Sequence, residues 1–182
     1  MADLSRPLRG RAWKLGDSVD TGQLAGGGVR VSDDPKANLK ANCLRVLRPE
    51  FNEQVQEGDI IVAGANFGCG SSRAMGIWAL QACGIQAVLA ESVSRLCLRN
   101  GVAQGLLSFN APGITALVED GDQVEIDYQG GAIRNLRTGQ SMPLRKLPPT
   151  VEAIYASGGI HQVIAKRLAQ EGILPPTPVA TS

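Results

Sequence analysis

An unbroken apolar run from Ile60 to Gly64 is the feature that most constrains the fold of this chain. Because polar residues do not alternate with apolar ones, a strand formed here would be buried on both faces, as in the parallel sheet of an α/β protein. A second apolar run spans Ile85 to Ala90, and helix-favouring segments follow the two runs at Arg73–Cys83 and Ser92–Gln104. This β-loop-α-β-α order predicts a right-handed crossover unit and the α/β class.

The segments on either side of this unit predict shorter elements. Before it, the pattern indicates a strand, a loop without periodicity, and a helix that stops ahead of Pro49: Arg9–Leu15, Gly22–Gly28 and Asp34–Leu47. After it, the pattern indicates strands, a hairpin turn with its returning strand, and a helix interrupted at two glycines: Ile114–Val118, Gln123–Tyr128, Gln129–Ala132, Ile133–Arg137 and Thr150–Gln170. We expect residues 1–173 to form a single domain, followed by a disordered Pro-rich tail over 174–182.

Charge and composition argue against several classes of protein. The 182 residues include 18 basic and 17 acidic side chains, and only 4% are aromatic. This balance lacks the basic surplus of a nucleic-acid protein and the aromatic platform of a single-strand binder. No run approaches the ~20 apolar residues that span a bilayer. The N-terminus also lacks the apolar core of a secretory signal, so we expect a cytoplasmic protein without membrane association.

The four cysteines are spread along the chain without a C-x-x-C pair: Cys43, Cys69, Cys83 and Cys97. In a reducing compartment such cysteines are expected to be free thiols. A metal or iron–sulfur site made by this chain alone would need closer pairs. We therefore expect no cofactor to be bound by this chain itself.

The stretch from Gly68 to Arg73 carries the clearest chemical signal. It links the buried strand to the first turn of a predicted helix, where N–H groups lack internal partners and the helix dipole is positive. Its two glycines allow a ligand to approach the backbone closely. Ser71, Ser72 and Arg73 add two hydroxyls and a guanidinium. Together these groups predict an anion site suited to a phosphate or a carboxylate.

Two plainer interpretations compete with that site: either serine could be a helix N-cap only, and Arg73 could be a solvated surface residue. Nucleotides fit poorly. A P-loop needs Lys where Gly70 stands, and a Rossmann fingerprint needs a third glycine where Arg73 stands. A small carboxylate fits better. A serine alkoxide stabilised by the loop N–H groups and Arg73 would suit proton abstraction from the carbon beside that carboxylate.

The run from Gly58 to Arg73 resembles the signature of the small subunit of 3-isopropylmalate dehydratase, the free-standing counterpart of the aconitase swivelling domain. The resemblance extends in both directions, to Gly16–Thr21, Trp78–Leu80, Gly84–Ala90, Asn100–Gly101 and Gly105–Leu107. It implies an α/β fold of the swivelling β/β/α three-layer type, like domain 4 of aconitase. It also implies a hydro-lyase or isomerase acting on a small hydroxy-dicarboxylate such as isopropylmalate.

The resemblance further implies roles for individual residues. Ser71 would be the base that removes or returns the substrate proton. Ser72 and Arg73 would bind the substrate carboxylate, and Gly70 and Cys69 would contribute to the same substrate pocket. In the family, a four-iron–four-sulfur cluster is held by cysteines of a large subunit. The implied partner is therefore a large iron–sulfur subunit.

The chain departs from the family pattern at two places. After Ser-Ser-Arg the family continues with Glu-His, where this chain has Ala74 and Met75. In the N-terminal substrate-facing loop, Gly28 stands at the family's arginine, and Arg30 is the residue that could bind substrate in its place. These departures leave two alternatives open. One is the same chemistry on 2-methylmalate/citraconate, dimethylmalate or homoaconitate, and the other is a non-catalytic carboxylate-binding or regulatory module.

Overall fold

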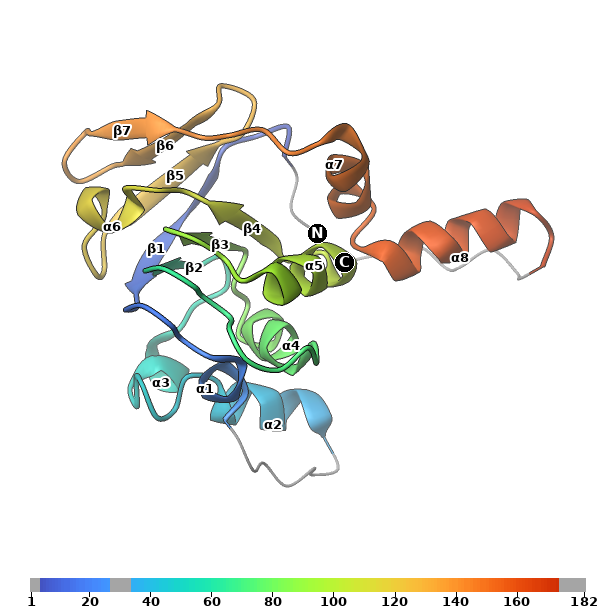
Figure 1. The fold of residues 1–182 in the computed structure, drawn as a ribbon, viewed down its shortest axis with the longest axis horizontal. Coiled ribbons are helices and arrows are strands. Elements are labelled where there is room, and N and C mark those ends of the chain that lie inside the picture. Colours follow the sequence, from blue (N-terminus) through green and yellow to red (C-terminus); the bar gives the residue numbers. More distant parts are fainter. Residues whose placement is uncertain (1–3, 27–33, 174–182) are drawn as a thin grey trace.

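Residues 4–26 and 34–173 are described by the structure, a computed structural model (Figure 1). The predicted tail at 174–182 and the predicted ligand Arg30 lie outside these residues. The strands are β1 Leu8–Lys14, β2 Ile60–Ala63, β3 Ala87–Ala90, β4 Leu107–Asn110, β5 Gln123–Asp127, β6 Ala132–Asn135 and β7 Ser141–Pro143. The helices are α1 Thr21–Ala25, α2 Pro35–Asn42, α3 Phe51–Gln54, α4 Met75–Ala82, α5 Arg95–Gln104, α6 Ile114–Leu117, α7 Pro149–Ala156 and α8 Ile160–Gln170.

The described strands form one mixed sheet in the order β4-β3-β2-β1-β5-β6-β7. Strands β1 to β4 are parallel to their neighbours, with Ile60 paired to Ala87 and Ala87 to Leu107. On its other side β1 pairs antiparallel with β5, and β5, β6 and β7 continue as antiparallel hairpins. The crossover unit and the hairpin predicted from the sequence are both confirmed.

Two apolar cores lie on opposite faces of the parallel strands, because alternate side chains of a strand point to opposite faces. One face contributes residues such as Ile61 and Val88 to a core with helices α1, α3, α4 and α5. The other contributes Ile60 and Leu89 to a core with β5, β6 and helices α6 and α7. The result is a helical layer, a parallel layer and an antiparallel layer (Figure 1). This arrangement confirms the β/β/α swivelling fold.

Several boundaries differ from the predictions. Thr21–Ala25 is a helix rather than loop, because Asp20 and Gln23 form a capping box around its first turn. Helix α2 ends at Asn42, not near Leu47, and the following Leu44 has a left-handed backbone with φ of 55°.

The segment Ile114–Val118 is helix α6 rather than a strand. The carboxylate of Glu91, at the end of β3, accepts hydrogen bonds from the N–H groups of Gly113 and Thr115 at the start of this helix (2.6 and 2.9 Å). Strands β4 and β7 were not predicted.

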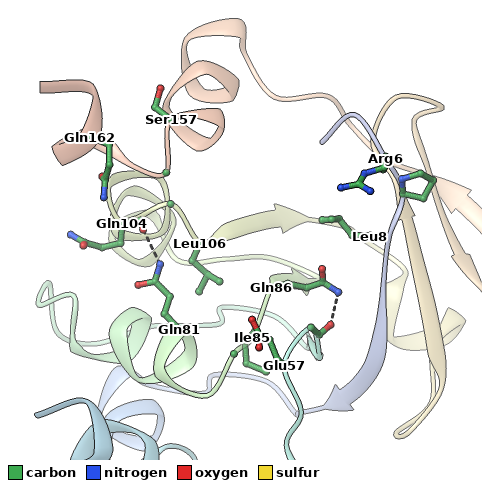
Figure 2. Close-up of a pocket in the computed structure, with 15 residues that line it drawn as sticks. Arg6, Leu8, Glu57, Gln81, Ile85, Gln86, Gln104, Leu106, Ser157 and Gln162 are labelled. Atoms are coloured by element: carbon green, nitrogen blue, oxygen red, sulfur yellow. Dashed lines mark hydrogen bonds between the residues drawn. The ribbon is translucent and has the colours of Figure 1, made fainter. Parts of the chain in front are cut away.

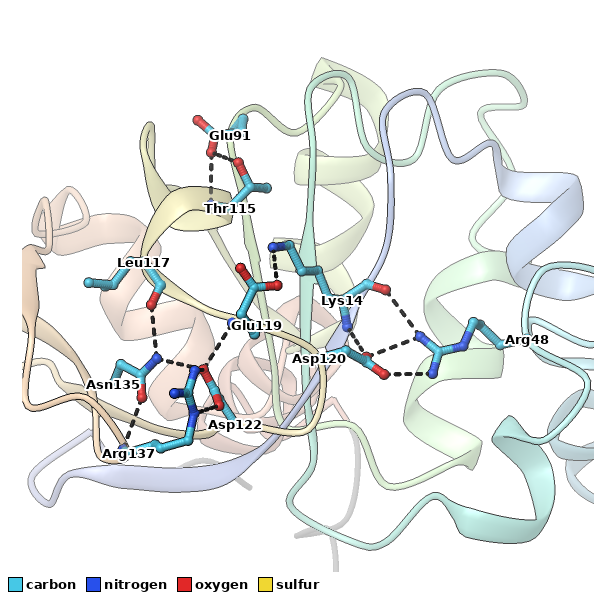
Figure 3. A network of polar contacts seen from close by, with 10 residues as sticks. All are labelled: Lys14, Arg48, Glu91, Thr115, Leu117, Glu119, Asp120, Asp122, Asn135 and Arg137. Atoms are coloured by element: carbon cyan, nitrogen blue, oxygen red, sulfur yellow. Dashed lines mark hydrogen bonds and ion pairs between the residues drawn. The ribbon is translucent and has the colours of Figure 1, made fainter.

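A polar network fixes the end of β1 next to the turn before β5 (Figure 3). The Lys14 N–H donates to Asp120 (2.8 Å), and the guanidinium of Arg48 binds both oxygens of the same carboxylate (3.0 and 2.9 Å). Asp122 accepts from Arg137 and from Asn135, and the Arg137 hydrogen bond is the main cause that holds its pKa below the ordinary value of 3.8. These contacts with Asp120 therefore fix the position at which the backbone leaves β1.

No helix in the two described ranges is long and apolar enough to cross a membrane.

Candidate active site

The predicted loop follows β2 at the carboxyl end of the parallel strands, where open α/β sheets bind their ligands. It runs from Gly64 to Ala74, after which α4 begins at Met75. The helix thus starts two residues later than Arg73, the predicted first residue. Its N-cap is Ala74, which makes no side-chain capping bond. Neither Ser71 nor Ser72 is therefore the N-cap of α4, and that plainer interpretation is wrong.

One side of the loop is held by the segment that leaves β1. The Gly68 N–H donates to the carbonyl of Val19 (2.8 Å), and the Thr21 N–H donates to the carbonyl of Cys69 (2.9 Å). Cys69 also directs its thiol at the Ser18 carbonyl (3.5 Å). The thiol of Cys69 therefore contacts the β1 side of the loop.

The other side of the loop is held by the segment after β3. The Phe67 N–H donates to the carbonyl of Ser92 (2.9 Å), and the Ser94 N–H donates back to the Phe67 carbonyl (2.8 Å). The Ser94 hydroxyl donates to the carbonyl of Gly68 (2.6 Å) and also caps α5. Hydrogen bonds from both neighbouring segments therefore define the path of the loop.

Gly68 and Gly70 have left-handed backbones, with φ of 71° and 97°. A Cβ atom at Gly68 would overlap the Cβ and Sγ atoms of Cys97, while one at Gly70 would lie 3.4 Å from Thr21 Oγ1. The left-handed backbone favours glycine at both positions, and at Gly68 the lack of space for a Cβ atom requires glycine as well.

Ser71 lies beside Arg73 at the turn before α4. Its Oγ accepts hydrogen bonds from the Arg73 backbone N–H (3.3 Å) and from Arg73 Nε (3.2 Å). Its own backbone N–H donates to the hydroxyl oxygen of Thr21, which is only 8% exposed (3.0 Å). Ser71 is half-buried and Arg73 is exposed, so both residues can be reached from solvent. The predicted pairing of a serine oxygen with a guanidinium is therefore present.

Ser72 and Gly70 are exposed on the same loop. The carbonyl of Ser72 accepts a hydrogen bond from Asn100 Nδ2 on α5 (2.8 Å). The structure thus brings Ser71, Ser72 and Arg73 together with Gly70, and it places the Cys69 thiol against the neighbouring segment.

Two residues that support the loop were not predicted as part of the site: Thr21 and Asn100. Thr21 lies within an Asp-x-x-Gln capping box, Asp20 to Gln23, that is readable in the sequence, but its contact with Ser71 spans 50 residues. Asn100 belongs to the run that resembles the family, yet nothing local shows that its amide reaches α4's loop.

The described part of the chain holds no group of three or more His, Cys, Asp or Glu side chains arranged to bind a metal ion. All four cysteines are free thiols, as predicted. Burial is the main cause that raises the pKa of Cys97 to about 11, and the neighbouring Cys69 raises it further. The thiol of Cys97 is therefore a packing group under the loop.

A cavity of about 730 Å³ opens at the opposite, amino ends of the parallel strands (Figure 2). Its polar lining includes Gln81, Gln86 and Gln104, and Gln81 already donates to the Gln104 carbonyl (2.8 Å). None of the predicted site residues lines it, so it is separate from the loop that carries Ser71.

The three-layer fold and the braced Gly-x-Gly-Ser-Ser-Arg loop define a swivelling domain of the aconitase type. Residues 30–113 match the family described as the aconitase C-terminal domain. The chain is 42% identical to the 3-isopropylmalate dehydratase small subunit 1 of Archaeoglobus fulgidus, over 88% of this chain and 98% of that protein. It is 37% identical to the isopropylmalate/citramalate isomerase small subunit of Methanocaldococcus jannaschii, over 90% of this chain and 96% of that protein.

The solved structure of 3-isopropylmalate dehydratase from Methanocaldococcus jannaschii superposes with a TM-score of 0.85 at 35% identity, covering 92% of this chain and 98% of that one. The chain belongs to the family of 3-isopropylmalate dehydratase small subunits.

Proposed function

We propose that this chain is the small subunit of a hydro-lyase that isomerises a small hydroxy-dicarboxylate such as isopropylmalate by dehydration and rehydration. The names of its relatives support the reaction class and the presence of a large subunit. The observation that carries the residue-level proposal is that Ser71 Oγ accepts two hydrogen bonds from Arg73 within a loop braced on both sides.

Ser71 is the proposed base. A serine hydroxyl is a weak base unless its ionised form is stabilised, and the two Arg73 donors lie where they would stabilise an alkoxide. The Thr21 hydroxyl holds the Ser71 backbone, so the oxygen is positioned before substrate arrives. Ser71 would remove the proton on the carbon beside a substrate carboxylate, and return it in the reverse direction.

Arg73 is the proposed carboxylate ligand. Only its Nε is bound to Ser71, so its terminal nitrogens can form a two-point contact with a substrate carboxylate. Ser72 and the backbone of Gly70 would add donors on the exposed side of the loop. We also assign Cys69 to the pocket, because it lies in the same loop as Ser71. Arg30 is assigned to the pocket as the residue that could bind substrate in place of the family's arginine.

The leaving hydroxyl needs an acid, and that role is assigned to neither Ser71, Ser72 nor Arg73. We propose that a four-iron–four-sulfur cluster on the large subunit meets this need, since a metal ion with an open position acts as a Lewis acid. No grouping of side chains suited to a metal exists in the part of the chain described. The contribution of this chain is then to bind the carboxylate and to move the proton.

The substrate has one specific alternative. A relative of comparable identity carries both isopropylmalate and citramalate in its name, so 2-methylmalate (citramalate) is the second candidate. Both are hydroxy-dicarboxylates that differ in the size of their alkyl group, which leaves the proposed roles of Ser71 and Arg73 unchanged.

The test is to combine the purified chain with the cluster-loaded large subunit of the same organism and to measure dehydration of isopropylmalate and citramalate. We expect turnover only when both chains are present. Ser71→Ala should abolish it, whereas Ser141→Ala, at an exposed serine of β7, should leave it unchanged. Unaltered turnover by Ser71→Ala would exclude the proposed base. Tight binding of malate-type ligands by the isolated chain, without turnover in the complex, would instead favour a binding module.

We further propose that residues 1–173 act as one domain and that the protein works in the cytoplasm, where its four thiols would stay reduced.

A further inference from the structure

Two cysteines that the proposed function does not use, Cys43 and Cys83, lie at the ends of neighbouring helices. Cys43 is the C-cap of α2 and Cys83 is the C-cap of α4, and these two helices pack against each other (Figure 1). Both side chains belong to the apolar core on the helical side of the parallel strands, where they are 0% and 4% exposed. The fold therefore brings together two thiols from separate parts of the chain.

The two cysteines meet at the carbonyl of Lys40, in the last turn of α2. The Cys43 backbone N–H donates to this carbonyl oxygen (3.2 Å), and the Cys83 thiol is directed at the same oxygen (3.9 Å). The thiol of Cys43 in turn donates a hydrogen bond to the sulfur of Cys83. Two sulfur atoms that already contact each other need only a short approach to reach the ~2.05 Å of a disulfide bond.

The contact makes the two thiols chemically unequal. The hydrogen bond from Cys43 is the main cause that lowers the pKa of Cys83 below its ordinary value; burial opposes this shift, and the charge of Lys40 adds to it. The same hydrogen bond is the main cause that raises the pKa of Cys43, and burial raises it further. Because the thiolate is the reactive form of a cysteine, Cys83 is the nucleophile of the pair.

Cys69 and Cys97 form the alternative pair, and their contacts are different. The Cys69 thiol donates to the carbonyl of Ser18. Burial raises the pKa of Cys97 to about 11, with a smaller contribution from the charge of Cys69. Cys83, by contrast, contacts the carbonyl of Lys40, whose side chain is exposed, so this thiol lies directly beneath the surface of α2. A molecule as small as hydrogen peroxide can therefore reach Cys83 with little displacement of the chain.

We infer that Cys43 and Cys83 are a disulfide-forming pair that hydrogen peroxide oxidises. The Cys83 thiolate attacks one peroxide oxygen, the O–O bond breaks, and a sulfenic acid and a hydroxide ion form. The Cys43 sulfur then attacks the Cys83 sulfur, the S–O bond breaks, and a second hydroxide ion leaves. The two protons given up by the thiols convert both hydroxide ions to water. Two thiols are thus oxidised while one peroxide is reduced to two waters.

The disulfide would join the ends of α2 and α4 and close a loop of about 40 residues. Such a cross-link stabilises a fold mainly by restricting the unfolded chain. Helix α4 begins directly after the loop that carries Ser71, so the bond would tie the helix that follows this loop to α2. In a reducing compartment the pair stays as two thiols, and the inference holds whatever substrate the chain acts on.

The test treats the full chain with hydrogen peroxide, blocks the remaining thiols and identifies tryptic peptides by mass spectrometry. Trypsin leaves each cysteine on its own peptide: 41–45, 46–73, 74–95 and 96–99. We expect the free thiols to fall from four to two, and the 41–45 and 74–95 peptides to be linked with the loss of two hydrogens. Dithiothreitol should reverse both changes. The oxidised chain should also unfold at a temperature about 5–10 °C higher than the reduced chain.

Cys83→Ala should abolish the link and the rise in unfolding temperature, whereas Cys97→Ala, at another buried cysteine, should retain both. Four free thiols after treatment overturn the inference, as does a link between the 46–73 and 96–99 peptides in place of the expected one. Recovery of Cys83 as a sulfinic acid with Cys43 still free overturns it as well. The peptide map of the wild-type chain decides the question even if Cys83→Ala does not fold.

Discussion

Replacing Gly68 with alanine tests whether the loop path is as tightly determined as its contacts indicate. Two costs add at this position. An alanine with φ of 71° is strained by about 1–2 kcal/mol. Its Cβ would also overlap the Cβ and Sγ atoms of Cys97, which is 3% exposed, at about 1–3 kcal/mol for overpacking. We therefore expect Gly68→Ala to lower the free energy of unfolding by about 2–5 kcal/mol, adding the two ranges.

Gly139→Ala is the matched control. Gly139 has nearly the same backbone, with φ of 73°, but no atom lies within 4 Å of where its Cβ would be. It should lose only the strain of about 1–2 kcal/mol. Urea unfolding followed by circular dichroism measures both variants. If Gly68→Ala costs no more than Gly139→Ala, Cys97 does not confine the loop and our description of the site is wrong.

Three further changes have defined outcomes. Thr21→Val removes the acceptor of the Ser71 N–H and should lower kcat of the complex about tenfold without weakening large-subunit binding; an unchanged kcat would show that Thr21 does not position Ser71. Ser94→Ala removes the cap of α5 and the donor to the Gly68 carbonyl, and should cost about 1–2 kcal/mol in urea unfolding. The folded-state pKa of Asp122 is held below 3.8, mainly by Arg137, so its contribution to stability is present above about pH 4 and is lost as pH falls. Asp122→Asn should therefore flatten the stability profile below about pH 4; an unchanged slope there would contradict this.

The sequence predicted the elements whose signal is local. The runs at Ile60 and Ala87 are strands because they are apolar at every position. The glycines after β5 predict the turn of its hairpin. The capping box at Asp20 is also a local signal and predicts a helix start, whereas the glycines around it favour a loop; the capping box determines the structure, and the segment is α1.

Other features depend on contacts between distant residues. The apolar segment at Ile114 has the composition of a strand, and it is a helix because a carboxylate 22 residues earlier binds its first N–H groups. The loop could be predicted as an anion site from Gly-x-Gly-Ser-Ser-Arg alone. Its rigidity could not, because Thr21, Ser94 and Asn100 reach it from three separate segments. Local patterns carry no information on such tertiary contacts.

The central claim is tested most directly by a competition experiment. Ser71→Ala replaces the wild-type chain in increasing proportion on a limiting amount of cluster-loaded large subunit, and the rate of dehydration is measured. The variant lacks only the Oγ that Arg73 contacts, so it should occupy the partner as well as wild type does and turn over nothing. Activity should then fall in proportion to the fraction of variant and reach the background rate when no wild type remains. Full activity with the variant alone, or activity indifferent to its excess, would show that the reaction does not depend on this serine in a shared pocket.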